Sequence, residues 1–165
     1  TIYKNTIVCY SWSKSLSLPG ERIGYVCVPD SCDNADEIYK GVAGAARANG
    51  HVCAPTLVQL VIERCVDEMP DLQAYDENRT LLYDSLTKMG YRCAKPDGAF
   101  YLFVEAPNGD SKAFSEKAKN DFNLLVVPGE GFECPGYLRL SYCVSNDMIR
   151  RSLPAFEKMY EAYKK

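Results

Sequence analysis

Two short apolar runs near the start of the chain constrain its fold most. Residues 6–10 (TIVCY) and 23–28 (IGYVCV) are separated by a serine-rich loop, and the second run stops at Pro29. Short apolar runs bounded by turn residues are typical of buried strands. Because two strands alone are rarely stable, we expect the rest of this sheet to belong to a longer protein whose N-terminal part is missing from this sequence.

The next segments predict three helices. Residues 34–48 carry acidic residues in their first turn and end at Asn49-Gly50. Residues 55–69 are apolar most of the way round, which predicts a helix that is buried on more than one side. Residues 72–89 carry a stripe of side chains at spacings of three and four, and Gly90 ends it. We expect this stripe to pack in a core.

The remainder of the chain alternates between strand and helix patterns. The first part holds a strand at 91–94, a Lys95-Pro96-Asp97-Gly98 turn and a strand at 99–105. A helix from Asp110 or Ser111 to about 121 follows, and then a strand at 124–127, a glycine-rich loop at 128–136 and a strand at 137–142. The last element is a helix at 146–163, which Pro154 should kink or divide. The fold class is α/β, with an α+β second part in which helices pack on a mixed or antiparallel sheet. Residues 1–70 and 71–165 are the two predicted parts.

Composition argues against several classes of function. The net charge is −3 without a lysine or arginine cluster, which argues against a nucleic-acid partner, and no apolar run approaches the length of a membrane span. The eight cysteines include no C-x-x-C pair, so we expect reduced thiols of a cytoplasmic protein, mostly as small core residues. His51 is the single histidine, and we predict no metal site and an exposed loop position for it.

The loop between the two apolar runs places Lys14 among alternating serines, with Arg22 further along. One interpretation is a flexible, solvated connection. The other is chemical: an amine that bonds to a phosphorylated aldehyde needs hydroxyls such as those of Ser11 and Ser13, and a guanidinium, to hold the phosphate. The glycine patterns of nucleotide-binding loops are absent around Lys14.

Two later motifs join this run. One is residues 96–103 (PDGAFYLF), and the other is the Val127-Pro128-Gly129 loop followed by Arg139-Leu140-Ser141. Taken by itself, a strand arginine such as Arg139 usually points to solvent. In this order, the three motifs resemble those of the class I/II (fold-type I) pyridoxal-phosphate-dependent aminotransferases over nearly the whole chain, although Trp12 departs from the family pattern.

The resemblance implies a role for each site residue. Lys14 would form the Schiff base with pyridoxal 5'-phosphate and move protons. Ser11, Ser13 and Arg22 would complete the cofactor site with Lys14. Arg139 would pair with the substrate α-carboxylate through the two prongs of its guanidinium.

The resemblance also implies an organisation. The chain would be the C-terminal portion of an aminotransferase, with residues 1–70 ending the large cofactor-binding domain and residues 71–165 forming the small domain. The parent enzyme would be a homodimer that transfers an amino group between an amino acid (aspartate-, alanine- or aromatic-type) and a 2-oxo acid. The family's aspartate, tyrosine and glycine-rich turn precede the lysine segment, so we expect the chain to be inactive alone.

Two alternatives stay open at this point. A C–S β-lyase on the same fold would carry the same lysine and arginine motifs. The chain could instead be a non-catalytic folded module that serves in dimerisation.

Overall fold

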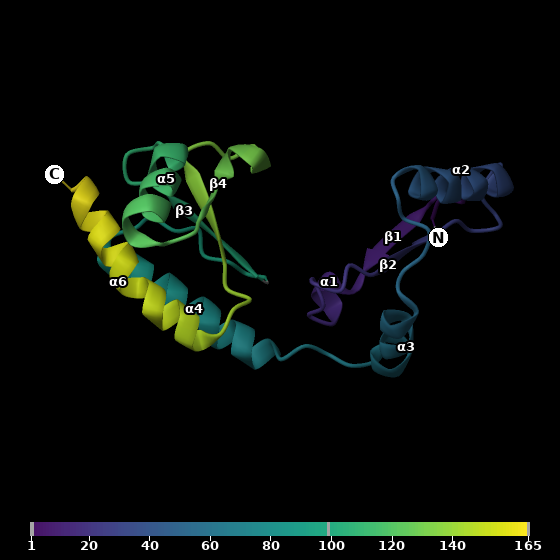
Figure 1. The fold of residues 1–165 in the computed structure, drawn as a ribbon, viewed down its shortest axis with the longest axis horizontal. Coiled ribbons are helices and arrows are strands. Elements are labelled where there is room, and N and C mark those ends of the chain that lie inside the picture. Colours follow the sequence, from purple (N-terminus) through teal and green to yellow (C-terminus); the bar gives the residue numbers. More distant parts are fainter. Residues whose placement is uncertain (1, 99, 165) are drawn as a thin grey trace. The chain divides into compact units, whose positions relative to one another are not determined.

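A computed structural model describes residues 2–98 and 100–164 of the chain. The chain divides into two compact units, Thr1–Pro70 and Asp71–Lys165 (Figure 1). We call them the first and second units and describe each by itself.

The first unit contains a two-stranded antiparallel sheet. Strand β1 (Val8–Ser11) pairs with β2 (Gly24–Cys27), and a one-turn helix, α1 (Trp12–Ser15), follows β1 directly. All four residues of each strand are exposed, so the prediction of buried strands is wrong for this structure. The physical reason is that, within the described ranges, the sheet consists of these two strands only and no helix covers either face.

Two longer helices complete the first unit. Helix α2 (Ala35–Ala48) is confirmed and follows Asn34, whose backbone is left-handed and whose side chain makes no capping bond. Helix α3 (Thr56–Cys65) begins after Pro55, and Ile62 is its one buried residue. The expected burial of this helix on more than one side is therefore wrong for this structure, because its apolar side chains face solvent.

The second unit packs three helices against a three-stranded antiparallel sheet. The helices are α4 (Leu72–Met89), α5 (Ser111–Phe122) and α6 (Asn146–Tyr163). The strands β3 (Tyr101–Glu105), β4 (Val127–Pro128) and β5 (Tyr137–Ser141) lie in the order β3-β5-β4. Figure 1 shows α6 alongside α4. This confirms the predicted fold class of helices on an antiparallel sheet.

The helix starts are set by capping side chains. The side chains of Asp71, Asp110 and Ser145 accept hydrogen bonds from backbone N–H groups in the first turns of α4, α5 and α6. Each bond satisfies a donor that the helix itself leaves unpaired. Gly90 ends α4 with φ at 107°, a conformation that costs glycine little.

Four details differ from the prediction. Residues 91–94 contribute only an isolated bridge between Cys93 and Val104. The strand predicted at 124–127 is wrong in its bounds, because β4 begins at Val127 and ends at Pro128. Helix α6 runs through Pro154 without dividing. The predicted strand at 99–105 begins at Tyr101, and Ala99 lies outside the described residues.

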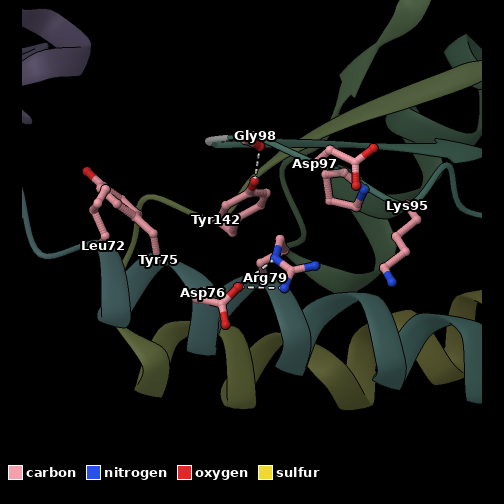
Figure 2. Close-up of a pocket in the computed structure, with 9 residues that line it drawn as sticks. Leu72, Tyr75, Asp76, Arg79, Lys95, Asp97, Gly98 and Tyr142 are labelled. Atoms are coloured by element: carbon pink, nitrogen blue, oxygen red, sulfur yellow. Dashed lines mark hydrogen bonds and ion pairs between the residues drawn. The ribbon is translucent and has the colours of Figure 1, made fainter.

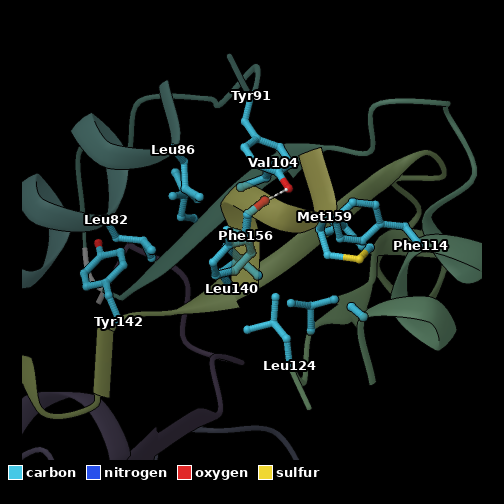
Figure 3. Packing of buried hydrophobic residues seen from close by; sticks show 14 of the residues in the cluster. Leu82, Leu86, Tyr91, Val104, Phe114, Leu124, Leu140, Tyr142, Phe156 and Met159 are labelled. Atoms are coloured by element: carbon cyan, nitrogen blue, oxygen red, sulfur yellow. Dashed lines mark hydrogen bonds between the residues drawn. The ribbon is translucent and has the colours of Figure 1, made fainter. Parts of the chain in front are cut away.

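The core of the second unit lies on one face of its sheet. Register pairs Leu102 with Leu140 and Val104 with Leu138, and all four side chains are buried. Side chains from α4, α5 and α6 cover them (Figure 3). Because side chains alternate along a strand, the opposite face carries Arg139 and its neighbours.

Two further predictions concern the cysteines and the absence of membrane-spanning segments. All eight cysteines are free thiols, but Cys32 alone is buried, so the prediction that most are core residues is wrong. Among the described residues, no helix is long and apolar enough to cross a membrane.

Candidate active site

The end of the first unit's hairpin holds the serines and the lysine. Ser11 Oγ donates a hydrogen bond to Ser13 Oγ at 2.8 Å and accepts one from the Ser13 N–H at 3.2 Å. Ser13 is buried, whereas Lys14 lies on the exposed side of α1. The serine alternation therefore builds a tight turn around the lysine rather than a loose loop.

Arg22 approaches the same end of the hairpin from β2. Ser11 pairs with Gly24, and the Trp12 N–H donates to the Ile23 carbonyl at 3.3 Å, so Arg22 lies next to these pairs. A Cβ at Gly24 would collide with the Tyr10 carbonyl, so only glycine permits this close pairing.

The backbone of the loop is strained at two residues. Arg22 has a φ of 53° and Ser17 a φ of 55°, both in the left-handed region. This conformation costs a residue with a Cβ about 1 kcal/mol or more. Strain of this kind clusters at functional sites. The Arg22 Nη1 donates to the Pro19 carbonyl at 3.0 Å, which fixes the guanidinium over the loop.

Ser15 provides a further polar atom, which was not among the predicted site residues. Its Oγ is buried and has no hydrogen-bond partner within the described part of the chain. Buried hydroxyls are nearly always paired, so an unpaired one suits a ligand that accepts a hydrogen bond. Hydroxyls, an amine and a guanidinium in one hairpin end are the donors that a phosphate dianion requires. The loop thus fits a phosphorylated aldehyde.

Aromatic rings form one side of the hairpin. Tyr10 stacks on Tyr25 with centroids 5.3 Å apart, and Trp12 lies 5.4 Å from Tyr25 and 5.7 Å from Tyr10. Trp12, the departure from the family pattern, therefore has a structural role, because it packs against the hairpin beside the lysine turn.

Arg139 lies in the second unit, on the open face of β5. Its Cζ is 3.8 Å from the centroid of Phe132 and 4.3 Å from that of Tyr101. No carboxylate within residues 2–98 or 100–164 forms an ion pair with it. It lines a pocket of about 420 Å³ whose other walls include Leu125 and Met148. The half-buried cation thus keeps its N–H donors for a ligand.

The loop that carries Phe132 is a 3-10 helix, η1 (Gly129–Phe132). The buried hydroxyl of Ser111 donates to Glu130 Oε1 at 2.6 Å, and this bond lowers the pKa of the Glu130 carboxyl. A Cβ at Gly129 would collide with the carbonyl of Cys134, so the glycine of the Val127-Pro128-Gly129 motif lets the loop fold tightly.

The Pro96-Asp97-Gly98 turn lines a different pocket of about 350 Å³ in the second unit (Figure 2). The Tyr142 hydroxyl donates to the Gly98 carbonyl at 2.5 Å, and burial raises the pKa of Tyr142. The turn is therefore tied to the strand-to-helix connection, which gives this motif a structural role.

The structure groups the predicted site residues by unit. Ser11, Ser13, Lys14 and Arg22 lie at one hairpin end of the first unit, and Arg139 lies in the second. His51 is exposed, as predicted. Within the described ranges, no group of three or more His, Cys, Asp or Glu side chains could hold a metal ion. The sequence analysis assigned no role to Tyr101, which lies in the PDGAFYLF motif, or to Phe132, which lies in the glycine-rich loop at 128–136.

The sequence and the structure were also compared with those of known proteins. The sequence model of the family "Aminotransferase class I and II" matches residues 2–156. The aspartate aminotransferase of Thermotoga maritima is 29% identical over 88% of this chain and 37% of its own length. An aminotransferase structure from Eubacterium rectale is 58% identical, with a TM-score of 0.79 over 99% of this chain and 41% of that one. The aromatic aminotransferase structure from Pyrococcus horikoshii is 26% identical, with a TM-score of 0.77 over 96% of this chain and 44% of that one.

The chain belongs to the class I and II aminotransferase family. This is a family of enzymes whose members depend on pyridoxal phosphate. The chain spans about two fifths of the length of the curated relatives it matches.

Proposed function

We propose that this chain contributes the lysine and one arginine of an aminotransferase active site. The reaction is the transfer of an amino group between an amino acid and a 2-oxo acid. The observation that carries the proposal is the hairpin end of the first unit, which carries paired serine hydroxyls, the lysine and Arg22, and in which the Ser15 hydroxyl lies buried without a partner in the described chain.

The first unit's residues would hold pyridoxal phosphate. Ser11, Ser13 and Arg22 bind the phosphate group, and the Ser15 hydroxyl adds a further donor. Lys14 provides the amine that bonds to the aldehyde. Pyridoxal phosphate, when bound, supplies an aldehyde carbon and a ring that withdraws electrons from the substrate.

Lys14 and Arg139 have separate tasks on the substrate. Lys14 Nζ would take the proton from the substrate Cα and later return a proton, which is general acid–base catalysis. Arg139 binds the α-carboxylate with two parallel N–H bonds, a geometry that lysine lacks. The ring contacts that occupy the faces of Arg139 support this role, because they leave its N–H edge available.

The proposal extends to the protein of which this chain is a part. The first unit would end the large domain, the second unit would be the small C-terminal domain, and the parent enzyme would be a cytoplasmic homodimer. Relatives named as aspartate and aromatic-amino-acid aminotransferases support amino donors of those types.

Substitution of Lys14 tests the proposal in the full-length parent protein. Lys14→Ala should lower turnover at least about a thousandfold, because it removes both the attachment amine and the proton carrier. Lys40→Ala, an exposed lysine on α2, is the matched control and should leave turnover unchanged. The products should be a new amino acid and a new 2-oxo acid. Normal turnover in Lys14→Ala, or release of pyruvate and ammonia instead, would overturn the proposal.

A further inference from the structure

Two aromatic rings lie against Arg139, and they come from different elements. Tyr101 belongs to β3 and Phe132 to η1, and the guanidinium carbon is over both rings at 4.3 and 3.8 Å from their centroids. Both distances are well inside the range of about 6 Å over which a cation and a ring attract each other. Phe103, which faces Arg139 in the strand register, meets Phe132 edge to face.

This packing leaves one part of the guanidinium for a ligand. Rings contact the flat face of the group, whereas its N–H donors lie in the plane and point outward. An arginine without such contacts has several rotamers and loses more entropy when it binds. Ring contact on the flat face therefore limits the group to few orientations without using its hydrogen bonds.

The ring on the loop is itself held in place. The bond from the buried Ser111 hydroxyl to Glu130 joins η1 to the start of α5. Gly129 packs so closely against the Cys134 and Tyr137 carbonyls that no larger residue fits. Phe132 is consequently presented by an anchored turn rather than by a loose loop.

We propose that Tyr101 and Phe132 are positioning residues that hold the Arg139 guanidinium with its N–H edge ready for a carboxylate. This inference rests on the function proposed above for Arg139. It adds a specificity determinant, because ligands that carry an α-carboxylate gain from the fixed orientation and ligands without one do not.

The first test measures the orientation itself by NMR on the full chain. The order parameter of the Arg139 Nε–H should be close to about 0.85, the value of a rigid N–H group, and should fall below about 0.6 in Phe132→Leu or Tyr101→Leu. Tyr101→Phe keeps the ring and should keep the wild-type value. Tyr137→Leu is the matched control, because Tyr137 lies on the same strand and face without a ring contact to Arg139. An order parameter that is unchanged in both leucine variants overturns the proposal.

The second test measures binding in the full-length protein loaded with pyridoxal phosphate. The probes are L-aspartate and L-phenylalanine, each compared with its own α-amide. In Phe132→Leu and Tyr101→Leu the affinity for the α-carboxylate form should fall about fivefold to tenfold, and that for the α-amide less than about twofold. An equal loss for both forms would mean a merely structural role and would overturn the proposal.

Arg139→Gln separates this inference from the function on which it rests. If Arg139→Gln abolishes the preference for the carboxylate and the ring variants do not weaken it, the positioning role is wrong and the proposed function stands. If Arg139→Gln leaves the preference intact, the proposed role of Arg139 fails, and the ring contacts have no part in substrate binding.

Discussion

The two units differ in how much of themselves they bury. Among the described residues of the second unit, seventeen buried hydrophobic residues form one cluster across the sheet and its helices. In the first unit, the described residues that are buried are Ser13, Ile23, Cys32 and Ile62. Because apolar burial stabilises a domain, we expect the second unit to fold alone and the first unit not to.

The exposed side chains of the first unit show what is lacking. Tyr25 and Val26 on β2, and Leu57 and Leu60 on α3, are each about half or more exposed. In the second unit, by contrast, apolar side chains of α4, α5 and α6 are buried against the sheet. The lysine turn thus lies in a unit with few buried side chains, whereas Arg139 lies in a unit with a buried core. The following predictions test this contrast, from the largest effect to the smallest.

Separation of the units should have the largest effect. Residues 71–165 expressed alone should unfold cooperatively in urea with a free energy of unfolding of about 5 kcal/mol or more. Residues 1–70 alone should show no cooperative transition and little amide protection. Circular dichroism and hydrogen exchange measure both, and a sharp transition in residues 1–70 would contradict the contrast.

The same large-to-small substitution in a helix of each unit should cost very different amounts of stability. Leu86 on α4 is fully buried, so Leu86→Ala should lower the free energy of unfolding by about 2–5 kcal/mol. Leu60→Ala on α3 makes the same chemical change at an exposed position, and should alter it by less than about 0.5 kcal/mol. Both free energies are measured by urea titration of the full chain. Equal losses of stability would mean that both helices are buried in solution and would contradict the contrast.

A buried amide should show the same contrast on a smaller scale. Asn78 Nδ2 donates to the Tyr142 carbonyl at 3.1 Å and to the Val144 carbonyl at 2.7 Å, joining α4 to the connection between β5 and α6. Asn78→Ala leaves these carbonyls unpaired and should cost about 1–3 kcal/mol. Asn49→Ala, which removes an exposed bond to the Ala45 carbonyl, is the control and should cost much less. Thermal unfolding of both variants measures the two losses of stability. Equal losses would contradict the prediction.

The smallest effect concerns the loop that carries Phe132. The bond from Ser111 holds the pKa of Glu130 below its ordinary value of 4.5. A carboxyl group whose pKa is lower in the folded than in the unfolded protein stabilises the fold at pH values above its unfolded-state pKa. This stability is lost as the pH falls through the folded-state pKa. Wild type should therefore lose stability below about pH 4.5 more steeply than Glu130→Gln. The free energy of unfolding of both proteins is measured as the pH is lowered. An equal fall in the two proteins would refute the contribution of the bond between Ser111 and Glu130.

Local patterns in the sequence predicted the second unit well. Asp110 and Ser111 were expected at the start of α5, the stripe at 72–89 gave α4, and Gly90 ended it. The expectation failed where the outcome depends on distant chain. Burial of the two N-terminal strands requires a covering layer, and residues 91–94 pair only through Cys93. The contacts of Arg139 with Tyr101 and Phe132 join three elements, so no local pattern contains them.

The measurement that tests the account most directly is the site of cofactor attachment. The full-length parent protein is incubated with pyridoxal phosphate, reduced with borohydride, digested and analysed by mass spectrometry. The account predicts the added pyridoxyl group on the peptide that contains Lys14, and its loss in Lys14→Ala. A pyridoxyl group on a different lysine, or on none, would contradict it.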